Sequence, residues 1–175
     1  PSSTHVFFKI MEERHGVTLI DQLGDDLGAR MTQVFETLFA QGYKSVVMIG
    51  TDVPTLPLEH YKQACEFLAS HDLVLGPALD GGYYLIGLTR PIPDLFNDIP
   101  WSTGQVLALT QEKAHALTLT TACITPWRDI DTIEDLTALI DAESLDTKKP
   151  KNERTFSNRT AGALQLLAKR LRTRA

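Results

Sequence analysis

Residues 49–57, Ile-Gly-Thr-Asp-Val-Pro-Thr-Leu-Pro, follow directly on the apolar run of residues 45–49, Ser-Val-Val-Met-Ile. The apolar run predicts a buried strand. Pro54 and Pro57 oppose a helix immediately after it, so the strand leads into a stiff loop that carries Asp52. Open α/β sheets bind ligands at such strand ends, and a carboxylate there suits a divalent cation that carries phosphates. The alternative is an acid in a surface turn.

Helices and strands are predicted to alternate on either side of this segment. Strands are expected at residues 4–10, 46–49, 72–77, 83–88 and 118–124, and helices at 25–42, 58–70, 103–117, 132–142 and 161–172. This alternation indicates a layered α/β fold. The link over residues 78–82 is too short for a crossover helix, so two strands form a hairpin or flank an irregular loop, and the sheet is mixed.

Size and composition are those of one globular domain of 175 residues. We expect residues 1–147 to form its body, and residues 148–175 to add a basic linker and a C-terminal helix. No apolar run approaches the length of a membrane span and no signal peptide is visible. Cys65 and Cys123 lie in apolar contexts and are interpreted as free, buried thiols, which favours the cytoplasm.

Charge is distributed unevenly along the chain. Residues 146–175 carry nine Lys/Arg and two acids, whereas the other 145 residues carry 8 basic and 20 acidic groups. A basic tail can bind nucleic acid, but this one has no aromatic residue besides Phe156. A solvated terminal helix is the plainer interpretation, so neither a nucleic-acid partner nor a membrane partner is expected.

A second candidate segment is Gly-Pro-Ala-Leu-Asp-Gly-Gly-Tyr-Tyr at residues 76–84. Gly81 and Gly82 allow backbone angles that other residues avoid and a close approach to a ligand. Asp80 could accept hydrogen bonds from sugar hydroxyls. The alternative is an ordinary hairpin turn, because Asp-Gly is a favoured turn pair.

The third candidate segment, residues 128–136, contains Asp129 and Asp131, which point the same way if the chain is extended. Asp131 or Thr132 could instead cap the following helix, with an acid three residues on completing a capping box. Capping and metal binding are compatible. Asp52 and Asp131, at two predicted strand ends with a Gly-Gly loop between them, together indicate a two-carboxylate cation site.

Trp101 and Ser102 precede a predicted helix. Ser102 or Thr103 could cap that helix, and Trp101 could wall a substrate pocket. The sequence has no Walker loop, no Gly-x-Gly-x-x-Gly, no His-Glu-x-x-His and no Gly-x-Ser-x-Gly. These absences argue against P-loop, classical Rossmann dehydrogenase and zinc-protease functions.

Five stretches occur in an order that resembles a known bacterial family: residues 24–31, 49–54, 76–84, 99–103 and 129–136. The family is the transferase 1, rSAM/selenodomain-associated family, a glycosyltransferase family of the nucleotide-diphospho-sugar transferase superfamily. The resemblance implies a three-layer α/β/α sandwich of the GT-A type with a mixed, mostly parallel sheet. It also implies a divalent metal, Mg or Mn.

The resemblance assigns roles residue by residue. Asp52 and Asp131 match the metal-ligand positions of the superfamily, with Asp129 as a helper. Asp80, Gly81 and Gly82 match the loop that meets the sugar or the acceptor. Family members begin with a strand and a Gly-rich basic loop that holds the nucleotide phosphates. Nothing like it precedes Asp25, so the sequence predicts that an N-terminal piece has been lost.

The resulting hypothesis is transfer from a nucleoside-diphosphate-activated donor to a small-molecule acceptor, with the phosphates neutralised by the cation and the acceptor oriented or deprotonated by Asp80. Nucleotidyl transfer, which releases pyrophosphate, is the close alternative because it needs the same groups. A non-catalytic nucleotide- or sugar-binding module is another. A phosphohydrolase is disfavoured, because its Asp-x-Asp follows the first strand and residues 129–131 come too late.

Overall fold

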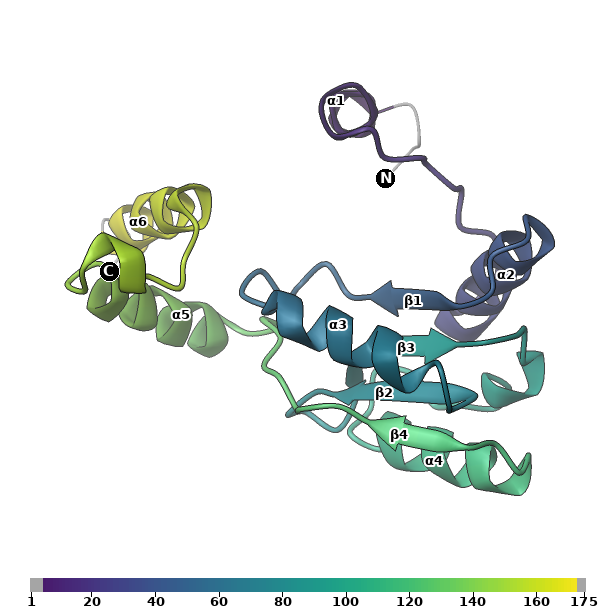
Figure 1. Ribbon diagram of the computed structural model, residues 1–175. Coiled ribbons are helices and arrows are strands. Elements are labelled where there is room, and N and C mark those ends of the chain that lie inside the picture. Colours follow the sequence, from purple (N-terminus) through teal and green to yellow (C-terminus); the bar gives the residue numbers. More distant parts are fainter. Residues whose placement is uncertain (1–4, 173–175) are drawn as a thin grey trace.

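The computed structural model describes residues 5–172, and its centre is a four-stranded sheet in the order β1-β3-β2-β4 (Figure 1). The strands are β1 (Val46–Ile49), β2 (Leu73–Pro77), β3 (Tyr83–Leu88) and β4 (Thr121–Cys123). All four fall within segments that the sequence predicts as strands. Strands β2 and β3 form an antiparallel hairpin, as one of the two predicted alternatives has it.

The sheet is mixed, as predicted. Strand β3 runs antiparallel to both of its neighbours, and β2 pairs with β4 in parallel. Strands β1, β2 and β4 therefore point the same way, although the β2–β4 pairing is the one parallel ladder among the described residues. Because these three strands share a direction, their carboxyl ends lie at one edge of the sheet.

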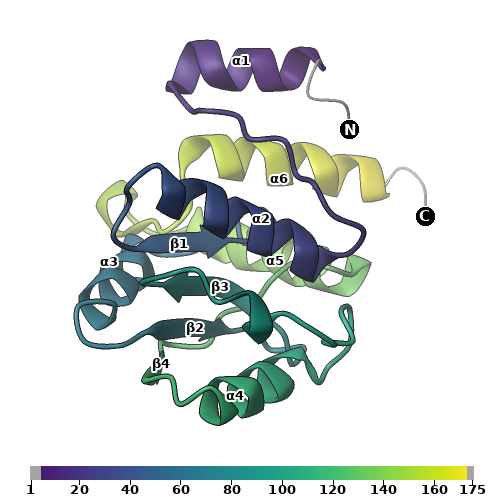
Figure 2. The ribbon, with the colours of Figure 1, turned by 90° about the vertical axis from the view of Figure 1, so that its right-hand side faces the viewer.

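Helices cover both faces of the sheet (Figures 1 and 2). Helices α2 (Leu27–Ala40) and α4 (Val106–Ala116) pack on one face, and α3 (Leu58–Phe67) packs on the other. A short 3-10 helix, η1 (Pro93–Leu95), contacts α4. All three α-helices lie within predicted helical segments, and α3 begins directly after Pro57 as expected.

Helix α2 shows how the local sequence fixes an element. The Asp26 side chain accepts a hydrogen bond from the Ala29 backbone nitrogen at 2.7 Å, which caps the helix. Met31 and Phe35 lie on its buried stripe, and the Phe35 ring stacks on Phe96 with 5.9 Å between ring centroids. The apolar stripe therefore holds α2 against the sheet.

The strand predicted at residues 4–10 is wrong. Thr4 lies outside the described residues, His5 is the N-cap of α1 (Val6–His15), and residues 6–10 belong to that helix. The His5 side chain accepts a hydrogen bond from the Phe7 backbone nitrogen, and Gly16 ends the helix at φ 63°. These two capping interactions outweigh the strand preference of Val-Phe-Phe. The helix buries none of its residues and stands apart from the sheet (Figures 1 and 2).

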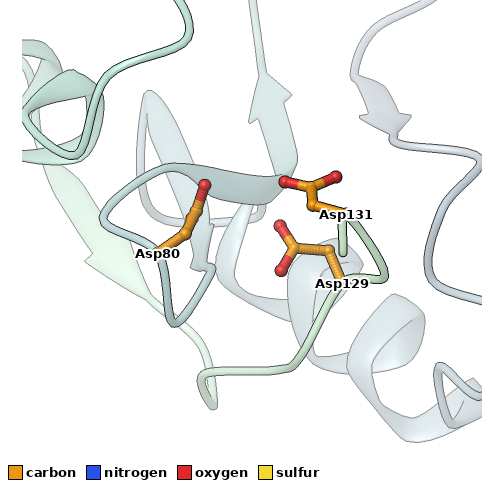
Figure 3. A group of neighbouring side chains, drawn as sticks. All are labelled: Asp80, Asp129 and Asp131. Atoms are coloured by element: carbon orange, nitrogen blue, oxygen red, sulfur yellow. The ribbon is translucent and has the colours of Figure 1, made fainter. Parts of the chain in front are cut away.

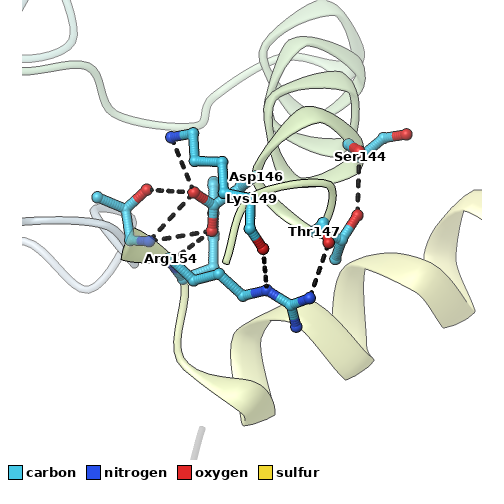
Figure 4. Close-up of polar contacts among 7 residues, drawn as sticks. Ser144, Asp146, Thr147, Lys149 and Arg154 are labelled. Carbon is cyan, nitrogen blue, oxygen red and sulfur yellow. Dashed lines mark hydrogen bonds and ion pairs between the residues drawn. The ribbon is translucent and has the colours of Figure 1, made fainter. Parts of the chain in front are cut away.

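The C-terminal part forms a pair of packed helices, α5 (Ile133–Asp146) and α6 (Asn158–Arg172), with a short 3-10 helix, η2 (Lys151–Glu153), between them. Asp146 joins the two. Its carboxylate accepts hydrogen bonds from Thr155 and from the Phe156 backbone nitrogen, and it pairs with Lys149 (Figure 4). The predicted final helix thus docks on α5, and Leu164 on its inner face is buried.

Two further predictions concern the cysteines and membrane-spanning segments. Cys65 and Cys123 are free, as expected, but both are exposed, so their interpretation as buried thiols is wrong. Each lies on an outward-facing position of its element. Among residues 5–172, none of the helices has the length and apolar character needed to cross a membrane.

Candidate active site

The segments that carry Asp52, Asp80, Asp129 and Asp131 come together beyond the carboxyl ends of β1, β2 and β4. Each segment follows one of these three strands. The Ile130 backbone nitrogen donates to the Asp52 carbonyl oxygen at 3.1 Å, so the first and third segments are joined directly. This edge is where open α/β sheets bind ligands.

The Asp52 segment leaves β1 through Gly50. A Cβ atom at this position would collide with the Asp52 carboxylate, which folds back over the glycine. The Gly50 backbone nitrogen donates to the Tyr84 carbonyl oxygen at 3.0 Å, so the loop stays anchored to β3 as it leaves the sheet. The chain therefore leaves the sheet with the exposed Asp52 side chain folded over Gly50.

The Asp80 segment is the tight turn of the β2–β3 hairpin. The Asp80 carboxylate accepts a hydrogen bond from the Gly82 backbone nitrogen at 2.9 Å. Gly81 adopts φ 93°, and a Cβ atom there would collide with the backbone of Gly104. The Gly81 carbonyl oxygen accepts from the Leu107 backbone nitrogen at 2.9 Å, so the turn is fixed to the start of α4. Asp80 is therefore an exposed acid on a rigid hairpin turn.

The third segment runs beside the hairpin. Its Trp127 forms a parallel bridge with Ala78 and donates its backbone nitrogen to the Pro77 carbonyl oxygen at 3.0 Å. Thr132, and not Asp131, caps α5 and forms a capping box with Asp135. Asp131 is therefore left exposed and outside the helix.

Three of the carboxylates form a cluster. Asp80, Asp129 and Asp131 each offer an oxygen, and these oxygens all lie within 4.8 Å of one another (Figure 3). Asp80 and Asp131 are exposed, and Asp129 is half-buried. Asp52 is close enough for its charge to act on Asp129. None of the ion pairs described within residues 5–172 involves any of these four acids.

The surroundings of the cluster disfavour the charged form of Asp129. Burial is the main cause that raises the pKa of Asp129 above its ordinary value, although a backbone hydrogen bond opposes it. The charges of the neighbouring carboxylates, Asp80, Asp131 and Asp52, raise this pKa further. Like charges held this close favour a cation or a proton between them.

A cavity of about 380 Å³ opens beside the cluster, between α2 and β1. Asp52 and Asp129 line it on the acidic side. Arg30 and Gln22 also line it, and so do apolar side chains that include Met31, Val34 and Met48. The cavity therefore combines carboxylates, a guanidinium and an apolar wall.

The donor set fits a hard divalent cation. Carboxylate oxygens are the ligands that Mg²⁺ and Mn²⁺ prefer, and neither His nor Cys belongs to this cluster. The residues that the sequence singles out as metal ligands, Asp52, Asp129 and Asp131, are brought to one region. The structure adds Asp80, which the sequence assigns to the acceptor, to the same cluster.

Trp101 and Ser102 are placed differently. Trp101 packs against the core beside α2, where a Cβ atom on Gly28 would lie 2.9 Å from its ring. Ser102 is exposed at φ 63°. Neither Ser102 nor Thr103 caps α4, whose N-cap is Gln105 without a side-chain hydrogen bond, so that capping prediction is wrong. The substrate-binding roles of Trp101 and Ser102 stay predictions.

Sequence reasoning did not single out Arg30. Its position at the exposed start of a helix is that of many solvated arginines. The one available signal is its place in Gly-Asp-Asp-Leu-Gly-Ala-Arg-Met, residues 24–31, a stretch already quoted for the family resemblance.

Fold and acids together define an α/β protein with a mixed sheet and a carboxylate cluster at its strand ends. A crystal structure from Desulfovibrio desulfuricans G20, described as a "putative nucleotide-diphospho-sugar transferase", is similar to it. The TM-score is 0.78 at 31% sequence identity, and the alignment covers 98% of this chain and 72% of that chain. None of the curated proteins matches.

The family model described as "Uncharacterized protein conserved in bacteria (DUF2064)" matches residues 2–103. The chain belongs to this family. The match includes two of the acid-bearing segments, those of Asp52 and Asp80, and ends before the third.

Proposed function

We propose that this protein is a metal-dependent transferase that takes its donor from a nucleoside-diphosphate sugar, and that the reaction is glycosyl transfer. The observation that carries the proposal is the convergence of Asp80, Asp129 and Asp131 within 4.8 Å at the carboxyl edge of the sheet. The likeness to the Desulfovibrio protein supports the same class. Helices on both faces of a mixed sheet are consistent with the three-layer GT-A type.

In this proposal Asp80, Asp129 and Asp131 together hold a Mg or Mn ion, with Asp52 beside them. The ion would supply Lewis-acid stabilisation of the negative charge that develops on the leaving phosphate. Asp80 stands on the rigid hairpin turn and is exposed, so it can also accept a hydrogen bond from an acceptor hydroxyl. Its backbone anchors to α4 fix it for that purpose.

The donor occupies the cavity between α2 and β1. Its phosphates would lie near Asp52 and Asp129, where a bound cation would offset the negative charge, and its base would lie against the apolar wall that includes Met31 and Met48. Assignment to the rSAM/selenodomain-associated branch and a cytoplasmic location belong to the same proposal.

Product analysis tests the proposal. The full chain is incubated with Mn²⁺ and a panel of nucleoside-diphosphate sugars, and free nucleotides and pyrophosphate are quantified. We expect release of a nucleoside diphosphate, and loss of at least 100-fold of the rate in Asp129→Asn and Asp131→Asn. Asp141→Asn, an exposed acid on α5, serves as the matched control and should keep the wild-type rate.

The other outcomes separate the alternatives. Pyrophosphate released from a nucleoside triphosphate would identify a nucleotidyltransferase instead. Metal-dependent nucleotide binding without any turnover would identify a binding module. Equal rates in Asp129→Asn and wild type would refute the site itself.

A further inference from the structure

Arg30 is held in a defined position at the start of α2. Its Nε donates a hydrogen bond to the Gly24 carbonyl oxygen at 3.0 Å, and its backbone nitrogen donates to the Asp26 carbonyl oxygen. Gly24 adopts φ 138°, and a Cβ atom there would collide with Ala29, so the turn that supplies this acceptor depends on glycine. The guanidinium is therefore oriented by the backbone, and not by another charge.

The rest of the guanidinium is available. Within residues 5–172 the two terminal nitrogens of Arg30 make neither a hydrogen bond nor an ion pair. Four N–H donors thus remain in a fixed plane. Such a planar fork matches the oxygens of a phosphate, which it can bind through two parallel hydrogen bonds.

In the part of the chain that the structure describes, the positive and negative side chains that line this cavity do not form ion pairs with one another. Arg30 lines the same space as Asp52 and Asp129, but it pairs with neither of them. A cation on the acids and the guanidinium of Arg30 would present two positive groups to one ligand. That arrangement suits a diphosphate, whose charge exceeds what one divalent cation neutralises.

We propose that Arg30 binds the diphosphate of the donor directly, from the side of the cavity that belongs to α2. The inference rests on the proposed function for the identity of the ligand, but the anion site itself does not require turnover. In this arrangement Arg30 binds the leaving group. The nucleobase of the donor lies against the apolar wall next to Arg30, and Met31 and Val34 contribute this wall from the same face of α2.

Calorimetric titration of the full chain tests the assignment with three probes: UDP with Mn²⁺, inorganic pyrophosphate, and uridine. Arg30→Gln should bind UDP and pyrophosphate about tenfold or more weakly than wild type, because charge-assisted hydrogen bonds are lost. Arg30→Lys should fall in between, since it keeps the charge but not the fork. Uridine binding should be unchanged in both variants.

Lys44→Gln is the matched control, because this exposed lysine precedes β1 at the end of the strand opposite Asp52. It should bind all three probes as wild type does. Thermal unfolding of each variant shows whether the fold is intact, since Arg30→Gln also loses the bond to Gly24.

The results separate this inference from the proposed function. Wild-type affinity of Arg30→Gln for UDP and pyrophosphate overturns the inference, even if sugar transfer and its metal dependence are found. No binding of either phosphate probe by the wild type also overturns it. Weaker pyrophosphate binding by Arg30→Gln, in a protein that turns over no nucleotide sugar, supports the anion site and rejects the transferase.

Discussion

Replacing Gly81 by alanine should disturb the Asp80 turn more than the backbone angle alone explains. At φ 93° an L-residue costs about 1 kcal/mol relative to glycine. The added Cβ would also collide with the Gly104 backbone, which cannot move away as a flexible side chain could. We estimate about 1–3 kcal/mol more for this overpacking, and so about 2–4 kcal/mol in total.

The matched control is Gly42→Ala. Gly42 has nearly the same backbone angle, φ 94°, but nothing lies within 4 Å of the position that its Cβ atom would take. Urea denaturation should therefore show a loss of about 1 kcal/mol for Gly42→Ala and clearly more for Gly81→Ala. Only Gly81→Ala should also weaken Mn²⁺ binding severalfold, because the turn that carries Asp80 must shift. Equal losses of stability in the two variants, with Mn²⁺ affinity unchanged in both, would refute this reasoning.

Three other changes should have defined effects. Phe35→Ala should lower the unfolding free energy by about 3–5 kcal/mol in denaturant titrations, because Phe35 is only 1% exposed and stacks on Phe96. Thr132→Ala should cost about 1 kcal/mol by removing the cap of α5, while Thr137→Ala, elsewhere on α5, should cost less. Asp146 should make the stability of the protein depend on pH. Burial would raise the pKa of its carboxyl, but hydrogen bonds from Phe156, Thr155 and Lys149 outweigh burial and hold that pKa well below its ordinary value of 3.8. Its stabilising effect is therefore complete above about pH 4 and is lost as the pH falls further. The protection of α6 amides, measured as the intrinsic exchange rate divided by the observed rate at the same pH, should therefore fall in acid for wild type but much less so for Asp146→Asn.

Local patterns predict much of this fold. Three patterns depend only on neighbouring residues: the apolar stripe of α2, the run Val46–Ile49 and the short link before Tyr83. Each predicts the element that the structure has. Residues 5–10 show the limit of such patterns. Their strand-forming side chains are overruled by Gly16, a helix stop that lies outside the segment on which the prediction was based.

Contacts between distant segments are harder to predict. That Asp52 and the acids of residues 129–131 share an edge follows from strand direction, but the approach of Asp80 to Asp129 depends on how the hairpin twists beside the third segment. The Asp146 junction depends on a loop that turns back nine residues later. The sequence alone does not distinguish Arg30 from a solvated helix residue, because segments far apart in the chain form the cavity that it lines.

The central claim is that acids from separate segments of the chain bind one divalent cation. Electron paramagnetic resonance of Mn²⁺ titrated with the full chain measures this most directly, because bound and free Mn²⁺ give different signals. We predict one bound Mn²⁺ per chain in wild type and in Asp141→Asn, and strongly reduced binding in Asp129→Asn and Asp131→Asn and also in Asp80→Asn, which lies in a separate segment. A wild-type protein that leaves the Mn²⁺ signal unchanged, or an Asp129→Asn variant that binds as wild type does, would contradict it.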